Sequence, residues 1–205
     1  MPLFFPPRWR RLLACALLLL PACALRAAEE VEVALVRFAA ARAPGGGSQP
    51  WLEAEVVIQA RPAPGAPGQM VSRVRVALLL GFEVPGPAGA DRRLDHYRAD
   101  AECVALEPGR TSVRFYLPPE LVKRDGLRGE PRYWGVELGV GGKPVPAGRS
   151  AYATSLATPE QRRAFQQRGG TAAAAQDGLL QPQYLTPFAS DYTRAAPSFV
   201  RREAP

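Results

Sequence analysis

Residues 73–84 read Arg-Val-Arg-Val-Ala-Leu-Leu-Leu-Gly-Phe-Glu-Val, and this stretch decides the fold class. Apolar residues occupy every second position from Val74 to Val84, and Arg73 and Arg75 lie on either side of Val74. Successive side chains of a β-strand point to opposite faces of a sheet, so a period of two places these apolar residues on one face. The stretch therefore predicts a long β-strand that is buried on that face.

The same alternation recurs on both sides of this stretch, in short segments separated by turn residues. These segments are 31–35, 51–60, 99–106, 113–117 and 133–140, and the alternation is weakest in 99–106. Six or seven such strands predict two packed antiparallel sheets, with a barrel of the oligosaccharide-binding type as the alternative. We expect residues 28–157 to form this mainly β domain, a β-sandwich with Val56, Leu78, Phe115 and Leu138 at inward positions.

The composition agrees with a sandwich and disfavours other classes. Pro and Gly contribute 22 and 19 of the 205 residues, too many helix breakers for a long helical bundle. Hydrophobic residues make up 47% of the chain, which is too many for global disorder. Gly141-Gly142 predicts a tight hairpin, and the prolines of the returning segment 143–146 predict an edge strand. Pro119 with Glu120 predicts one or two helical turns.

The first 24 residues have the three parts of a secretory signal peptide in the right order. Arg8, Arg10 and Arg11 form a basic region, an apolar run follows from Leu12 to Leu20, and Ala22-Cys23-Ala24 offers small residues for cleavage. The apolar run is about half of the ~20 residues that a membrane span needs. Leu20-Pro21-Ala22-Cys23 also resembles a lipobox, so lipidation at Cys23 is an alternative in which the protein is anchored to a membrane. We expect an exported protein of the periplasm or cell surface.

The net charge does not indicate a nucleic-acid partner. Cleavage after Ala27 would remove four of the 26 basic residues, and with them more than half of the formal charge of +7. The remaining charges are interspersed, without a run of basic residues that alternates with aromatic ones. Cys103 would be the one cysteine well inside the mature chain, and we expect it to be a buried apolar residue.

The C-terminal quarter, residues 158–205, has a different character. Thr158-Pro159-Glu160-Gln161 predicts a helix with a capping box, which should end near Arg168 at Gly169-Gly170. A tail follows with four aromatic residues, more than a solvated linker needs: Tyr184, Phe188, Tyr192 and Phe199. We predict that they dock, either on the chain's own sandwich or on a partner, with plain disorder as the alternative.

Catalytic chemistry has little support in the sequence. His96 is the sole histidine, so a zinc site with the usual ligands cannot be assembled and a catalytic triad would have to use His96. We expect His96 at the surface or in a loop. No Gly-rich phosphate-binding motif or nucleophile elbow occurs. Glu53 and Glu55 share a strand face, and we expect Arg73 and Arg75 on the following strand to be their charge partners. We therefore expect a non-enzymatic protein without a metal or cofactor.

Several of these segments also carry a family resemblance. They are residues 51–56, 113–120 and 133–134, and the closing stretches 183–188 and 197–203. Together they resemble a group of exported verrucomicrobial proteins similar to the immunoglobulin-like protein associated with the type IV pilus gene cluster. The resemblance implies an immunoglobulin-like sandwich with an envelope or pilus-linked role, and it carries over no catalytic residue.

Two functions follow as expectations. The first is an envelope interaction module whose partners are other envelope or pilus-assembly proteins. The second is a carbohydrate- or ligand-binding module in which Trp51 and Tyr133 stack on sugar rings. Trp134 is a weaker stacking candidate, because it shares a strand face with Val136 and Leu138 and is expected in the core.

Overall fold

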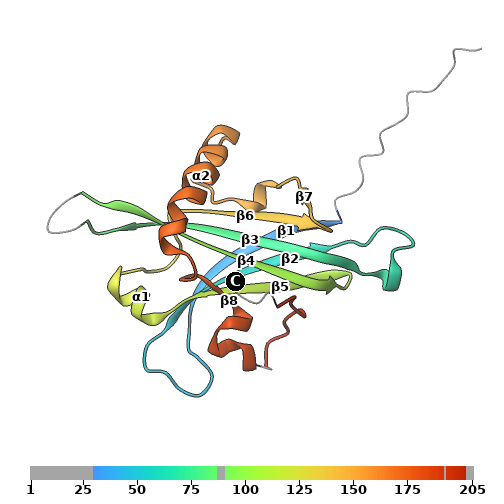
Figure 1. Ribbon diagram of the computed structural model, residues 1–205, viewed down its shortest axis with the longest axis horizontal. Coiled ribbons are helices and arrows are strands. Elements are labelled where there is room, and N and C mark those ends of the chain that lie inside the picture. Colours follow the sequence, from blue (N-terminus) through green and yellow to red (C-terminus); the bar gives the residue numbers. More distant parts are fainter. Residues whose placement is uncertain (1–29, 87–90, 192, 202–205) are drawn as a thin grey trace, which may run out of the picture.

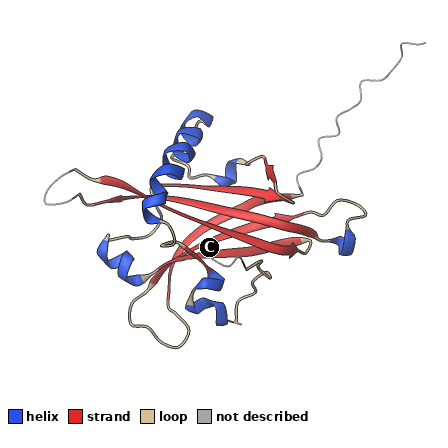
Figure 2. Cartoon of the chain, in the orientation of Figure 1, coloured by secondary structure: helices blue, strands red, loops and turns tan. Residues whose placement is uncertain are grey.

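Two antiparallel four-stranded sheets face each other in the computed structural model, which describes residues 30–86, 91–191 and 193–201 (Figure 1, Figure 2). Sheet A has the order β1-β2-β5-β8, and sheet B has the order β4-β3-β6-β7. The strands are β1 (Val31–Ala41), β2 (Trp51–Ala60), β3 (Val71–Val84), β4 (Arg93–Leu106), β5 (Gly109–Leu117), β6 (Tyr133–Val140), β7 (Lys143–Val145) and β8 (Gln181–Pro182). The predicted immunoglobulin-like β-sandwich is confirmed, and the two sheets do not close into the alternative barrel.

The core lies between the two sheets and follows the predicted strand phases. Val56, Leu78, Phe115 and Leu138 are all buried, and they come from β2, β3, β5 and β6. Cys103 is also fully buried. The alternation in the sequence therefore identified the inward face of the four central strands correctly.

The predicted hairpin, edge strand and short helix are present. Gly141 and Gly142 have φ values of +56° and +82°, and they connect β6 to β7 at the edge of sheet B. Both positions need the left-handed region that glycine adopts without steric cost. Helix α1 (Pro119–Arg124) begins with Pro119 in its first turn.

Helix α2 (Pro159–Ala172) begins as predicted but ends later. The Thr158 hydroxyl accepts from the Gln161 N–H, and the Gln161 side chain accepts from the Thr158 N–H. The helix continues through Gly169 and Gly170. Gly169 does not end the helix here, because its missing side chain lets the helix pack closely on β3. A Cβ atom at Gly169 would lie 2.6 Å from Leu79 Cδ2 on β3.

His96 was expected at the surface or in a loop, and this prediction was wrong. Strand β4 begins at Arg93, six residues before the predicted segment, and it includes His96. The imidazole is buried beside the ring of Phe165 of α2, with 5.8 Å between the ring centroids. The charged residues between 91 and 95 hide the alternation of this part of the strand.

The chain after α2 returns to the sandwich through four short elements. They are η4 (Ala173–Gln176), β8, η5 (Gln183–Leu185) and η6 (Pro187–Ser190). Strand β8 pairs with β5, so the fourth strand of sheet A comes from residues that lie outside the predicted range 28–157. Two further short 3₁₀ segments are η1 (Pro67–Gln69) and η3 (Arg149–Ala151). Among the described residues, no helix is long and apolar enough to cross a membrane.

Candidate functional site

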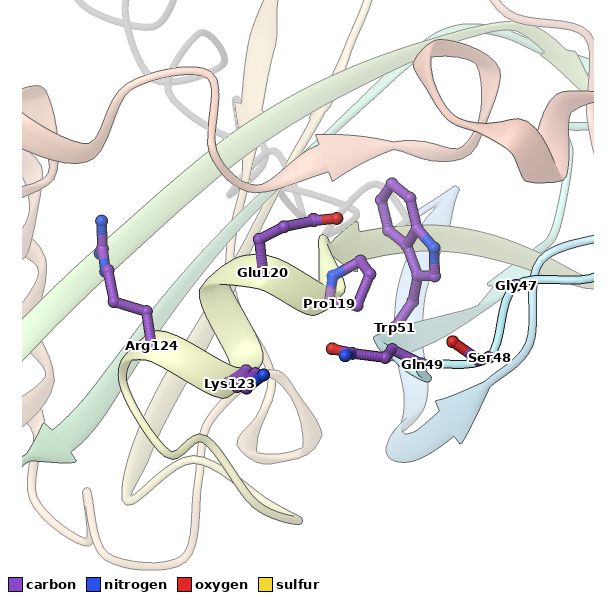
Figure 3. A pocket seen from close by; sticks show the side chains of 8 residues that line it. All are labelled: Gly47, Ser48, Gln49, Trp51, Pro119, Glu120, Lys123 and Arg124. Atoms are coloured by element: carbon purple, nitrogen blue, oxygen red, sulfur yellow. The ribbon is translucent and has the colours of Figure 1, made fainter.

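A groove of about 700 Å³ lies where the loop before β2 approaches α1 (Figure 3). The loop residues and Trp51 form one wall of the groove, and α1 forms the other wall. The lining residues are Gly47, Ser48, Gln49, Trp51, Pro119, Glu120, Lys123 and Arg124. Its volume lies within the range of about 300–1,000 Å³ that is usual for small-molecule sites. The groove opens onto the surface, so a ligand there would remain partly in solvent.

Two other aromatic rings fix the orientation of Trp51. The indole is nearly perpendicular to the ring of Tyr116 at 6.5 Å and to the ring of Phe188 at 5.7 Å, with interplanar angles of 83° and 88°. Such edge-to-face pairs add roughly 0.5–1.5 kcal/mol to the effect of burial alone. Trp51 itself is half-buried. The ring is therefore an ordered part of the groove wall and not a mobile surface side chain.

The polar side chains of the groove fall into two groups. Arg124 forms an ion pair with Asp125 at 2.7 Å and lies at the far end of the groove from Trp51 (Figure 3). Its hydrogen bonds hold the pKa of Asp125 below the usual value. By contrast, the side chains of Ser48, Gln49, Glu120 and Lys123 have no hydrogen bond or ion pair with any residue that the structure describes.

Trp51 and Tyr133 do not belong to one site. Trp51 begins β2 in sheet A, whereas Tyr133 begins β6 in sheet B and packs against Phe165 of α2 at 5.9 Å. The Tyr133 hydroxyl also accepts a hydrogen bond from Arg132 Nε at 3.1 Å. The two rings therefore cannot stack on the same sugar, and stacking on either ring stays a prediction. Trp51 stays a candidate, and Tyr133 is part of the packing under α2.

The tail docks on the chain's own sandwich, which is one of the two predicted outcomes. Phe188 is fully buried on sheet A, where its ring stacks on Tyr116, so it is not available to a partner protein. Tyr184 and Phe199 are half-buried and contact each other, with 5.1 Å between the ring centroids. Tyr192 and Cys23, the residue considered for lipidation, lie outside the described residues.

Buried charges hold the tail on sheet A. Both Glu53 carboxylate oxygens accept hydrogen bonds from Arg194 Nη1, at 3.0 and 2.8 Å. Arg114 donates to Glu55 at 2.8 Å and to the Ala195 carbonyl at 3.0 Å. Arg114 lies on the outward face of β5, but the tail covers it and leaves it 7% exposed.

The expected partners of Glu53 and Glu55 were wrong. Strand β2 pairs with β1 and β5, whereas β3 belongs to the other sheet, so Arg73 and Arg75 cannot reach these carboxylates. Arg73 instead pairs with Glu102, and Arg75 with Asp100. Sequence adjacency of two strands is a weak guide to pairing in a sandwich, because consecutive strands often change sheets.

Burial and the ion pairs between β2, β5 and the tail shift the pKa values of several groups on this face of sheet A. Desolvation acts to raise the pKa of Glu55, but hydrogen bonds from Ser112 and Arg114 and the Arg114 charge hold it below its usual value. Burial raises the pKa of Tyr116, and the nearby Glu53 carboxylate raises it further. Hydrogen bonds from Thr193 and Arg194 lower the pKa of Asp191. Glu55 is thus an ion-pair partner of Arg114 on β5 and Asp191 of Arg194 in the tail, whereas the Tyr116 hydroxyl stays neutral.

Cys103 lies in the core, where solvent does not reach its thiol. Burial raises the pKa of the Cys103 thiol to about 12, so it is not a nucleophile near neutral pH. Within residues 30–86, 91–191 and 193–201, no group of three or more His, Cys, Asp or Glu residues is arranged to hold a metal ion. The groove at Trp51 is accessible from the surface, and its aromatic ring and polar side chains suit it to binding.

Comparison with known proteins gives a structural relative. No protein-family profile matches the sequence, and no curated protein matches it. A crystal structure of a protein from Akkermansia muciniphila has a similar fold. It superposes with a TM-score of 0.62 over 85% of this chain and 94% of that chain, at 17% identity. The organism is a verrucomicrobium, the group to which the sequence resemblance pointed. At this identity the likeness establishes the fold alone.

Proposed function

We propose that the chain is a non-enzymatic, exported cell-envelope protein whose sandwich binds another protein of a type IV pilus or similar surface assembly. The leader pattern at residues 1–24 supports export, and the verrucomicrobial fold relative is consistent with an envelope role. The observation that carries the proposal is the open outer edge of β1, which offers backbone groups for pairing with a strand of another protein.

The outer edge of β1 is unpaired along Val36–Ala41, although the short segment η3 packs beside this strand. A β-bulge between Val33 and Leu35 interrupts the first part of the strand. In the described residues, no backbone hydrogen bond from another segment reaches Val36–Ala41 on the side away from β2. This stretch contains a single charge, Arg37, and neither lysine nor proline. It therefore lacks the lysine and proline that often protect an edge strand, and the bulge lies before this stretch.

Other sheet edges have such protection. Strand β7 carries Lys143 and Pro144, and β8 is two residues long and ends in Pro182. At β4, the Val104 N–H donates to Ser198, and the Val200 N–H donates to the Glu102 carbonyl. The tail thus covers part of the outer edge of sheet B. The contrast supports β1 as the place where a partner strand adds to sheet A.

Two adjacent alanines of β1, Ala39 and Ala40, allow a test of edge pairing in which one proline variant is the control for the other. In an antiparallel ladder the N–H groups of neighbouring residues point to opposite sides of the strand, so one of Ala39 and Ala40 donates to β2 and the other points outward. Proline removes the N–H in either case. Urea unfolding of Ala39→Pro and Ala40→Pro should identify one variant near wild-type stability, the one that loses only the outward group.

The stable proline variant is then used for capture from an envelope extract of the organism that encodes the chain. We expect wild-type protein to retain an envelope or pilus-assembly component identified by mass spectrometry. The stable variant should retain about ten-fold less, because a lost backbone donor and a clash at the edge together approach the 1.4 kcal/mol of a ten-fold change. Equal retention by both proteins, or retention of no such component by the wild type, would contradict the proposal.

A further inference from the structure

We propose that the groove at Trp51 binds a neutral hexose oligosaccharide, with the indole as its stacking surface. The site goes beyond the proposed protein-binding role of the β1 edge. It consists of Trp51 from β2, Ser48 and Gln49 from the preceding loop, and Glu120 and Lys123 from α1 (Figure 3).

The aromatic ring is ordered before any ligand arrives. Tyr116 and Phe188 hold the indole at nearly right angles to their own rings. A sugar ring presents C–H groups with partial positive charge, and these are attracted to the negative face of an aromatic ring. Because the Trp51 side chain is already fixed, a sugar that stacks on it does not have to order it, which reduces the entropic cost of binding.

The polar groups around the ring are unoccupied and chemically mixed. Ser48 and Gln49 each supply a donor and an acceptor, Glu120 supplies acceptors, and Lys123 supplies donors. None of these side chains is engaged with a residue in the described part of the chain. A sugar hydroxyl is both donor and acceptor, so a mixed set of this kind suits a polyhydroxylated ligand.

Many charged side chains elsewhere on the two sheets are engaged in ion pairs and are not available to a ligand. On sheet B, Arg73 pairs with Glu102 at 2.8 Å and Arg75 pairs with Asp100 at 2.9 Å. On sheet A, Glu53 pairs with Arg194 of the tail. The groove instead combines an ordered tryptophan with polar side chains that are free to bind a ligand.

The charge balance of the groove selects a neutral ligand. The free charges of Glu120 and Lys123 have opposite sign, and Arg124 is neutralised by Asp125. An anionic polymer would meet one free cation and one free carboxylate, with no net attraction. A neutral hexose chain gains hydrogen bonds from both groups without that repulsion. The open form of the groove lets one or two sugar units bind while the rest of the chain stays in solvent.

Tryptophan fluorescence gives a direct measurement on the leader-free protein, which contains Trp51 and Trp134. Trp134 is buried and its Nε1 donates to Glu130, so a ligand-induced change reports on Trp51. The probes are neutral tri- to hexasaccharides of glucose, mannose, galactose and N-acetylglucosamine. We expect at least one of them to bind with a Kd of about 10 μM to 1 mM, the weak range typical of an open site.

The variants test the stacking ring first and then two groove side chains that have no structural contacts. Trp51→Ala should abolish binding, but it also removes ring contacts in the fold. Gln49→Ala and Lys123→Ala should each weaken binding about five- to ten-fold at an unchanged melting temperature. Lys143→Ala, at the opposite edge in β7, is the matched control and should bind like the wild type.

The proposal fails under any of three results. One is that no neutral oligosaccharide binds at millimolar concentration. Another is that Gln49→Ala and Lys123→Ala bind as tightly as the wild type. The third is that an anionic polysaccharide such as polygalacturonate binds more tightly than every neutral probe. The stable proline variant of the β1 edge should still bind the oligosaccharide, which keeps this test separate from the protein-binding proposal.

Discussion

The ring of Phe188 lies parallel to the ring of Tyr116, with 4.0 Å between the ring centroids and 6° between the ring planes. Tyr116 is on β5 and faces outward from the sandwich, and Phe188 comes from η6 of the C-terminal tail. Both are fully buried, because each covers the other. The stacked pair therefore fixes the tail on the outer face of sheet A, next to the ring of Trp51.

We expect Phe188→Ala to destabilise the whole domain and not only the tail. Removing a buried phenylalanine costs about 3–5 kcal/mol through lost burial and the cavity that remains. Urea unfolding followed by circular dichroism measures the change. Leu185→Ala is the control, since Leu185 is 64% exposed on the same tail and should change stability by no more than about 0.5 kcal/mol. Similar losses for both would mean that Phe188 does not hold the tail.

The buried carboxylate of Glu53 should matter more than a surface carboxylate on the neighbouring strand. Glu53→Gln removes one of the two carboxylates that pair with Arg194 and leaves it only Asp191, and a broken charged hydrogen bond in a partly buried setting costs about 1.5–3 kcal/mol. Glu32→Gln removes the exposed pair with Arg61 and should cost at most about 1 kcal/mol. A double-mutant cycle of Glu53→Gln with Arg194→Ala gives the coupling directly. A coupling near zero would show that the pair does not anchor the tail.

The strands could be predicted from the sequence because their signal is local. Val56, Leu78, Phe115 and Leu138 each belong to a segment with a period of two, and that period alone determines which face is inward. The start of β4 was missed because charged residues interrupt the period before Tyr97. His96 was misplaced for the same reason, since a residue in an unrecognised strand is taken for a loop residue.

The tail contacts could not be predicted, because the fold creates them between distant residues. The Glu53–Arg194 hydrogen bonds span 141 positions, and the bond from Arg114 to Ala195 spans 81. The four aromatics in the tail did indicate docking, but nothing local showed which surface they meet. Trp51 was identified as a binding candidate from its type and position. The side chains of α1 that complete the groove were not, since the fold alone brings α1 beside the loop before β2.

Two adjacent glycines of α2 should respond in opposite ways to the same substitution. A Cβ atom at Gly169 would lie 2.6 Å from Leu79 and 3.0 Å from the His96 ring, so Gly169→Ala overpacks the layer under the helix. Overpacking typically costs about 1–3 kcal/mol, more than the gain of about 1 kcal/mol in helix propensity. At Gly170 the nearest atom is Arg98 Nη1 at 3.7 Å, so Gly170→Ala should stabilise by about 0.5–1 kcal/mol. Thermal unfolding of both variants decides the matter, and stabilisation by both would refute the close packing of Gly169 on β3.

Maturation gives a prediction that does not depend on the fold. The order of basic, apolar and small residues in the leader predicts that the exported protein begins between Cys23 and Glu29. Intact-mass spectrometry of protein from the native envelope measures the first residue. An added lipid mass on Cys23 would select the anchored form. Retention of Met1 or Pro2 would contradict export through a cleaved signal peptide.

His96 should make the stability of the sandwich depend on pH below 6.5. Burial under α2 lowers the pKa of the imidazole from its ordinary value of 6.5, with the Asp95 charge opposing and the Arg168 charge adding to the effect. Its Nδ1 atom is buried and has no hydrogen-bond partner in the described residues, so the folded state offers the proton little stabilisation. The unfolded chain therefore binds a proton first as the pH falls. The stabilisation is complete above pH 6.5, and it is lost progressively as the pH falls through the lowered pKa of the folded state, with a slope of up to about 1.4 kcal/mol per pH unit.

A nuclear magnetic resonance titration of this single histidine should give a midpoint below 6.5 in the folded protein. Urea unfolding at several pH values should show the free energy of unfolding falling over the same range, and His96→Gln should remove that part of the dependence. The loss that arises from Glu55, whose lowered pKa departs from an ordinary value of 4.5, occurs at lower pH, where the carboxyl takes up its proton. It should persist in the His96→Gln variant, which separates the two groups. A midpoint at or above 6.5, or an unchanged pH dependence between pH 5 and 6.5 in the variant, would show that the imidazole is not held neutral beneath the helix.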